Sequence, residues 1–212
     1  MTQRTALLLG ATGLTGSLLL NLLLQSEDYK KVIIYVRKST NQIHPKLVEQ
    51  IIYYDTIETA VEADDVFCCL GTTIKIAKTK EAFEKVDLHY PLKIAALQHK
   101  AGSTQFLVVS AMGASASSSI FYSKTKGLME AGLEAIGFES LYIFRPSFIM
   151  GNRKEERTGE KIGIAISKWI ASLMVGPLKN YQPVEASAIA ASMIAHALSN
   201  QKGNQLILSG KI

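Results

Sequence analysis

The sequence has little cysteine, one tryptophan, and neither a long apolar run nor a tract of one charge sign. Its two cysteines, Cys68 and Cys69, are adjacent, so they cannot form an ordinary disulfide with each other, and free thiols indicate a reducing compartment. No stretch approaches the roughly 18 apolar residues that a membrane-spanning helix needs. The apolar stretch after Arg4 resembles a secretory signal, but no cleavage pattern follows it. We therefore expect a soluble, cytoplasmic protein without a membrane span.

Two further absences restrict the partners. The net charge is +5, but the basic residues are spread over many segments without interleaved aromatic residues, so we expect no nucleic acid partner. The four histidines show no metal-ligand spacing, so we expect no metal site. With 212 residues, 48% of them hydrophobic, the chain has the size of one compact domain. We predict a single domain over residues 1–212.

A glycine-rich segment, GATGLTG over residues 10–16, separates one apolar run from another. A strand that turns sharply into a helix is typical of nucleotide-phosphate sites, because the first N–H groups of the helix face the anion. Gly10 allows the tight turn, Gly13 lets a pyrophosphate approach the backbone, and Gly16 lets the helix pack on the strand. The cofactor-binding residues predicted in this segment are Gly10, Thr12, Gly13, Leu14, Thr15 and Gly16.

Short apolar runs alternate with segments of helical periodicity along the chain. The predicted strands are Ala6–Leu9, Val32–Val36, Ile51–Tyr54, Val66–Leu70, Phe106–Val109, Leu141–Phe144 and Leu206–Leu208. The predicted helices are Leu14–Gln25, Glu58–Glu62, Lys80–Lys100, Tyr122–Ile136, Lys161–Val175 and Glu185–Ser199. We expect Pro91 to kink or divide the helix that contains it. The alternation predicts a doubly wound α/β fold, the NAD(P)-binding Rossmann fold, with a mostly parallel seven-stranded sheet and helices on both faces.

The segment YSKTK places Tyr122 and Lys126 four residues apart, on one face of a predicted helix. A free tyrosine has a pKa of about 10, and a neighbouring ammonium favours its phenolate form, which suits acid–base work nearer neutrality. Ser110 ends the strand before that helix. We predict a catalytic set in which Tyr122 transfers the substrate proton, Lys126 also binds the nicotinamide ribose, and Ser110 holds the substrate oxygen.

The residues after the second predicted strand indicate the choice of cofactor. An NAD-preferring protein usually places Asp or Glu there, whereas this chain has Arg37 and Lys38. Two cations can pair with a 2′-phosphate, so we predict NADP(H), with Arg37 contributing most of the preference because its guanidinium stacks and forks better.

These motifs resemble a known family. GATGLTG, the set of Ser110, Tyr122 and Lys126, and the segment RPS over residues 145–147 are similar to those of the atypical short-chain dehydrogenase/reductases. Within that class, CCLGTT, YSKTKG and RPSFIMGNRKEER look like segments of the Tat-interacting-protein-like oxidoreductases, and the likeness covers nearly the whole chain.

The resemblance assigns further roles. It implies that Asp55, at the end of the third predicted strand, accepts from the adenine amino group. It also implies that a second group lines the adenine ribose and a third meets the nicotinamide carboxamide through backbone groups: Leu70, Gly71 and Thr72, and then Ser147, Phe148 and Ile149. Relatives carry two serines where this chain has Ser110 and Ala111, so Ser118 and Ser119 are alternates for the catalytic serine. Arg145 has two readings, a functional one and pairing with a neighbouring carboxylate.

The sequence thus predicts an NADP-dependent oxidoreductase that acts on a small carbonyl or alcohol. The alternatives are an NADPH-binding regulatory or redox-sensing protein that acts through a partner and, more weakly, a nucleotide-sugar epimerase or dehydratase. Residues 151–183 are expected to form a small substrate-side or lid portion. Its apolar helix Lys161–Val175 is read as core, lid or dimer face, so a protein partner or a second copy of the chain stays open.

Overall fold

A seven-stranded sheet forms the centre of the part of the chain that the computed structural model describes, residues 3–151, 181–199 and 201–212. Its strands, in spatial order, are β3 (Leu47–Ile51), β2 (Tyr29–Val36), β1 (Arg4–Leu9), β4 (Asp65–Cys68), β5 (Gln105–Val109), β6 (Ser140–Arg145) and β9 (Gly203–Leu208). Every neighbouring pair is parallel. The strand order reverses next to β1, at the edge where α/β folds bind nucleotides, and the doubly wound fold is confirmed.

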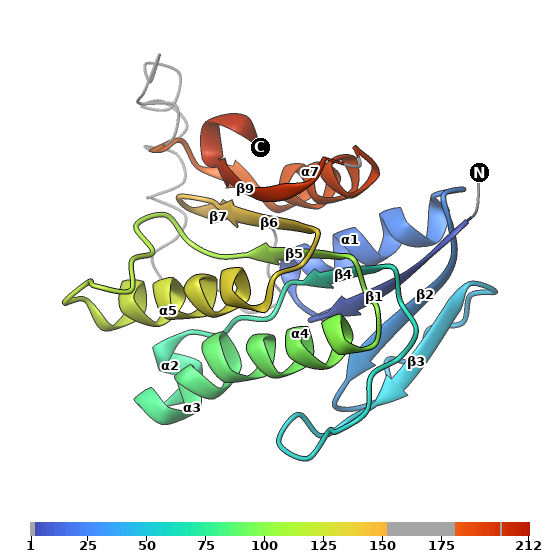
Figure 1. The fold of residues 1–212 in the computed structure, drawn as a ribbon, viewed down its shortest axis with the longest axis horizontal. Helices are drawn as coiled ribbons and strands as arrows, with labels where there is room; N and C mark the ends of the chain where they lie inside the picture. The colour runs from blue at the N-terminus through green and yellow to red at the C-terminus, as the bar shows by residue number, and fades with distance from the viewer. Residues whose placement is uncertain (1–2, 152–180, 200) are drawn as a thin grey trace.

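Helices cover both faces of the sheet, as Figure 1 shows. α1 (Leu14–Gln25) packs against α7 (Ala186–Leu198) on one face, and α4 (Tyr90–Lys100) packs against α5 (Phe121–Ile136) on the other. Each layer has its own buried hydrophobic cluster, because alternate residues of each central strand point to opposite faces. The predicted bounds of α1 are confirmed.

The predicted helix over residues 80–100 is divided, as expected for a helix that contains Pro91. It consists of α3 (Lys80–Glu84), a π-helical turn η1 (Lys85–His89) and α4. Pro91 lies in the first turn of α4 and has no N–H to donate to the carbonyl of Asp87. The Tyr90 N–H instead bonds to the carbonyl of Lys85, five residues back, which is the π-helical pattern.

Several sequence predictions are wrong in detail. The third strand runs over Leu47–Ile51 instead of Ile51–Tyr54, because it is an edge strand whose Glu49 and Gln50 hide the apolar pattern. Residues 58–62 form no helix; the nearby Ile57 and Val61 pack on the core from an irregular loop. Four short elements were not predicted: α2 (Ile74–Ala77), the parallel pair β7 (Ile149–Met150) and β8 (Val184–Glu185), and η3 (Ser209–Lys211).

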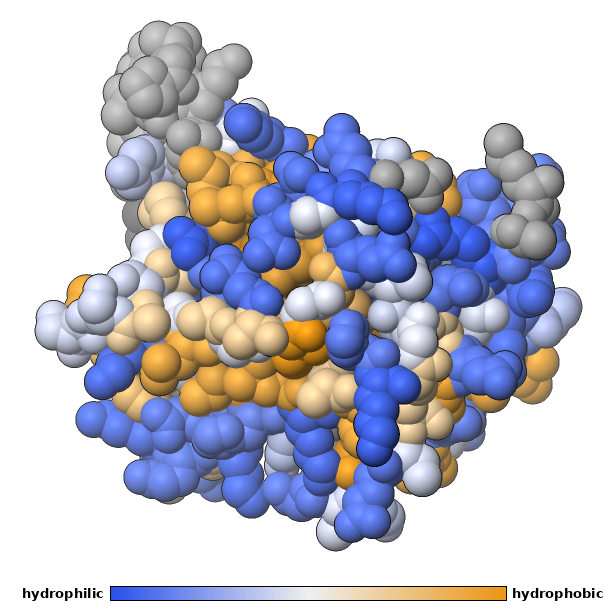
Figure 2. Space-filling view, viewed as in Figure 1, coloured by the Kyte–Doolittle hydropathy of each residue, from blue (hydrophilic) through white to orange (hydrophobic). Residues whose placement is uncertain are grey.

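The lid portion predicted over residues 151–183, with its helix Lys161–Val175, lies almost entirely outside the described residues. In the described part, no helix is both long enough and apolar enough to cross a membrane. Figure 2 shows a band of hydrophobic residues across the middle of one face, with hydrophilic side chains above and below it. This pattern fits a sheet whose apolar layers are covered by amphipathic helices.

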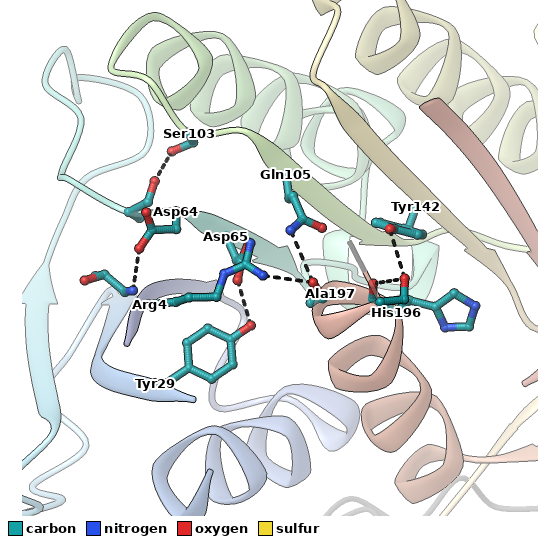
Figure 3. A network of polar contacts seen from close by, with 12 residues as sticks. Arg4, Tyr29, Asp64, Asp65, Ser103, Gln105, Tyr142, His196 and Ala197 are labelled. Carbon is teal, nitrogen blue, oxygen red and sulfur yellow. Dashed lines mark hydrogen bonds and ion pairs between the residues drawn. The ribbon is translucent and has the colours of Figure 1, made fainter. Parts of the chain in front are cut away.

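A polar network closes the amino edge of the sheet, opposite the predicted site (Figure 3). The Arg4 guanidinium pairs with the buried Asp65 carboxylate, which also accepts a hydrogen bond of 2.7 Å from the Tyr29 hydroxyl. Arg4 and Gln105 both donate to the carbonyl of Ala197 near the end of α7, at 3.0 and 3.2 Å. Burial raises the pKa of Asp65 to about 7, because Arg4 and Tyr29 offset the desolvation only in part.

Candidate functional site

The turn between β1 and α1 is built by two close backbone approaches. Gly10 has a φ of +79°, and a Cβ there would lie 2.6 Å from the carbonyl oxygen of Cys69. A Cβ at Gly16 would lie 2.0 Å from the carbonyl oxygen of Gly10, so the helix packs directly on the turn. Gly13 caps α1 without a side-chain hydrogen bond, and its Cβ would lie 3.3 Å from the Gly10 oxygen. The first-turn amides of α1 therefore lack a capping side chain and form a potential anion site.

A cleft of about 1100 Å³ opens at the carboxyl edge of the sheet, beside this turn. The predicted site residues that line it are Thr12, Gly13, Leu14, Thr15, Lys38, Leu70, Gly71, Thr72, Ser110, Tyr122, Lys126, Ser147, Phe148 and Ile149. Four predicted residues are outside the lining: Gly10, Gly16, Arg37 and Asp55. The first two shape the turn from behind, as their close contacts require. The alternates Ser118 and Ser119 are also outside it, and Ser110 is inside.

Tyr122 and Lys126 lie in the first two turns of α5, on the face that lines the cleft. Tyr122 is 40% exposed and its ring lies 5.8 Å from the ring of Phe83 on α3. Lys126 is buried, and its Nζ pairs with the Asp87 carboxylate at 2.7 Å. The next residue is a glycine, Gly127, because the loop after β5 lies against the helix there. A Cβ at Gly127 would lie 2.1 Å from the Ser115 carbonyl carbon.

Ser110 lines the cleft with its proton already engaged. Its hydroxyl donates to the buried carboxylate of Glu130, two turns after Tyr122 on α5. The same carboxylate accepts two hydrogen bonds from Arg145, one of them from Nε at 3.0 Å. A carboxylate paired with a guanidinium has no proton to give, so Ser110 must be the donor. Ser110 thus presents lone pairs to the cleft. Arg145 pairs with a neighbouring carboxylate, which is the second of the two roles expected for it.

The segment after β2 supplies one cation to the cleft. Lys38 lines it together with Ser39 and Thr40. Thr40 donates from its backbone N–H and hydroxyl to Glu49 on β3, at 2.8 and 2.6 Å, which fixes the segment. Arg37 is exposed outside the lining, and its charge acts on Tyr54 and Tyr90 behind the loop. The expectation that Arg37 dominates over Lys38 therefore loses its geometric support.

Asp55 lies beyond the end of β3, not at its end as expected. Its exposed carboxylate pairs with Lys85 at 3.1 Å, and this hydrogen bond is the main reason that the pKa of Asp55 lies below its usual value. Lys93 holds the same loop by donating to the carbonyls of Tyr54 and Asp55. The Asp55 carboxylate is therefore already paired, and is not free to accept a hydrogen bond from an adenine.

At the opposite end of the cleft, two backbone groups of the segment after β6 are already bonded. The Ser147 N–H donates to the Ser209 hydroxyl at 2.7 Å, and the Phe148 carbonyl accepts from the Val184 N–H at 2.8 Å. The predicted contact to a carboxamide must therefore use the other backbone groups of residues 147–149.

Two residues that sequence reasoning missed are the acidic partners of the site, Asp87 and Glu130. A signal existed for Glu130, because it follows Tyr122 and Lys126 at the next helical repeat of four residues. None existed for Asp87, whose direction depends on the π-helical turn.

Burial raises the pKa of both thiols. Cys68 is buried, and desolvation raises its pKa to about 11, which is typical of an inert thiol. Cys69 lines the cleft, but its sulfur lies 3.9 Å from that of the buried Met193, and desolvation raises the pKa of its thiol as well. Over the described residues, no cluster of three or more His, Cys, Asp or Glu side chains is suited to a metal ion.

Comparison with curated sequences finds relatives along the whole chain. Protein HTATIP2 of Rattus norvegicus is 30% identical over 222 aligned positions, which cover 100% of this chain and 88% of that protein. A protein of Candida albicans named "Protein FMP52, mitochondrial" is 28% identical over 213 positions, covering 96% and 93%. No family model matches the chain.

Comparison with solved structures finds the same fold at low identity. MoeE5 in complex with UDP-glucose and NAD superposes with a TM-score of 0.71 at 15% identity, over 95% of this chain and 74% of that one. UDP-N-acetylglucosamine 4-epimerase from Methanobrevibacter ruminantium M1 gives 0.72 at 16% identity, over 98% and 77%.

Proposed function

This chain belongs to the family of protein HTATIP2, among the atypical short-chain dehydrogenase/reductases, and we propose that it is an NADP-dependent oxidoreductase of a small carbonyl or alcohol. One observation carries the proposal: Ser110, Tyr122 and Lys126 line the same cleft as the first turn of α1. A phosphate site and a proton-transfer site that share one cleft suit hydride chemistry on a dinucleotide.

The cleft fits a dinucleotide. Its volume of about 1100 Å³ is at the upper end of ligand pockets. The pyrophosphate would lie against the first-turn amides of α1, where Gly13 leaves the space that a side chain would fill. Lys38 would pair with a 2′-phosphate, and Leu70, Gly71 and Thr72 would line the adenine ribose. NAD is named in the solved structure of MoeE5, and the cation at Lys38 is our reason to propose NADP here.

The proton steps belong to the protein. When bound, the cofactor supplies or takes the hydride at the substrate carbon. In the reduction direction Tyr122 gives its phenol proton to the substrate oxygen, and Lys126 stabilises the phenolate that remains. To hold the substrate oxygen, Ser110 would turn its proton from Glu130 to that oxygen, while Glu130 keeps its two hydrogen bonds from Arg145.

The test is NADPH oxidation by the purified protein across a panel of aldehydes, ketones and quinones, with the Tyr122→Phe variant as the matched blank. Turnover that the variant lacks supports the oxidoreductase. NADPH binding without turnover anywhere in the panel would instead support the regulatory protein, and the next step would be a search for its partner. Interconversion of UDP-sugars would support the epimerase. The cytoplasm is our proposed location, although the FMP52 relatives are named mitochondrial.

A further inference from the structure

Lys126 is surrounded by groups from three elements. Asp87 faces it from η1, Tyr122 from α5 and Cys68 from β4. Asp87 is the neighbour that forms an ion pair with Lys126, whereas desolvation raises the pKa of the Cys68 thiol to about 11. The Lys126 ammonium and the Asp87 carboxylate therefore act on Tyr122 together.

The pair is built as a unit. The Lys126 side chain is 5% exposed, that of Asp87 is 1% exposed, and the atoms Nζ and Oδ1 lie 2.7 Å apart. The second oxygen of Asp87 accepts a hydrogen bond of 2.8 Å from the backbone N–H of Thr72, which itself lines the cleft. Both carboxylate oxygens are used, so the anion cannot turn away from the lysine without leaving a buried donor unpaired.

Burial lowers the pKa of Lys126, but the Asp87 carboxylate and Tyr122 raise it by more, so it lies above the ordinary lysine value. The lysine therefore stays charged near neutral pH. An ammonium without a counter-ion would favour the Tyr122 phenolate strongly, whereas a paired one favours it less.

We propose that Asp87 is a positioning residue that fixes the Lys126 ammonium beside Tyr122 and balances its charge, so that the tyrosine keeps its proton until a substrate takes it. This role rests on the proposed function, in which Tyr122 is the proton donor. The π-helical turn is what directs Asp87 at the lysine, and π-helical turns are frequent at functional sites.

The test measures tyrosine ionisation directly and needs no substrate. Protein labelled with ¹³C at the ring carbon that bears the hydroxyl is titrated by NMR, and the signal of Tyr122 is assigned by its loss in Tyr122→Phe. In Asp87→Asn the midpoint for Tyr122 should move down by about one pH unit, since losing a buried negative charge near the phenolate lowers its pKa by that order. The control Glu139→Gln removes an exposed carboxylate that pairs with Lys202, and it should leave the midpoint unchanged.

A second comparison covers the case that Asp87→Asn does not fold. Lys126→Met should raise the midpoint, and Lys126→Met with Asp87→Asn, which leaves no unpaired buried charge, should bring it back toward the parent value. An unchanged or raised midpoint in folded Asp87→Asn, or equal midpoints in the single Lys126→Met and the double variant, would overturn the proposal. Neither result depends on turnover, so a failed substrate panel overturns the proposed function and leaves this measurement standing.

Discussion

Both edges of the sheet bury a charged pair, but they treat the neighbouring hydroxyl groups differently. At the amino edge, the Tyr29 hydroxyl donates its hydrogen bond to Asp65 within the polar network (Figure 3). At the carboxyl edge, the Lys126–Asp87 pair is also buried, yet Tyr122 beside it is 40% exposed and lines an open cleft. A buried pair that binds the neighbouring hydroxyl serves stability, whereas one that leaves a hydroxyl facing a cleft is arranged for chemistry.

The largest expected effect is at the carboxyl edge, in Gly13→Val. Gly13 has φ −80° and ψ 173°, which a valine adopts, and its Cβ would meet the Gly10 oxygen at 3.3 Å, so the fold should survive. The new side chain would occupy the phosphate position, and NADPH binding should be lost. Isothermal titration with a circular-dichroism check measures both. Gly16→Val is the contrast, because its Cβ at 2.0 Å from the Gly10 oxygen should prevent folding; unchanged NADPH affinity in Gly13→Val would remove the phosphate site.

Next is Tyr122→Phe, which sharpens the comparison by removing only the exposed hydroxyl. Turnover on a substrate found in the panel should fall by roughly 10²-fold or more, because the proton donor is gone. NADPH affinity should stay near the parent value. Tyr53→Phe, at an exposed tyrosine outside the cleft, should leave both unchanged. Full activity in Tyr122→Phe would mean that another group donates the proton.

Cofactor preference comes third. We expect the parent to bind NADPH about 10- to 100-fold more tightly than NADH, since one or two partly desolvated charge-assisted contacts are worth that much. Lys38→Ala should remove most of the difference and Arg37→Ala little, because Lys38 lines the cleft and Arg37 does not. Titrations of both cofactors at two salt concentrations measure it. Equal affinities in the parent would exclude the 2′-phosphate contact, and a larger loss in Arg37→Ala would return the role to Arg37.

The smallest effect concerns the closed edge and changes stability with pH. Asp65 has its pKa raised to about 7 when folded, against about 3.9 in an unfolded chain, so between these values the folded state holds a proton that the unfolded state has released. Stability should therefore fall as pH rises from about 4 to 7, by at most about 1.4 kcal/mol for each pH unit. Asp65→Asn should flatten this slope in urea unfolding, and Glu62→Gln, at an exposed carboxylate that does not act on Asp65, should not. Equal slopes in parent and Asp65→Asn would contradict it.

The sequence was sufficient where one local rule decides the structure. GATGLTG with its apolar flanks predicted α1 and the turn at Gly10, and the spacing of Tyr122 and Lys126 predicted their common face. It failed where long-range pairing decides: β3 depends on its register with β2, and the proton of Ser110 goes to a carboxylate 20 residues away. Lys38 and Arg37 are adjacent and chemically alike, so only the path of the loop separates them.

The direction of the Asp87 side chain depends on the number of residues in the π-helical turn Lys85–His89. A π-helical turn holds one residue more than an α-helical turn, so losing one residue after Asp87, either Leu88 or His89, would remove the π-helical turn. The residues before the deletion would then rotate by about 100° relative to those after it. Asp87 would turn away from Lys126 while α4 kept its core face. In a lineage of such proteins, a single codon deletion there would disarm the site and leave the fold in place.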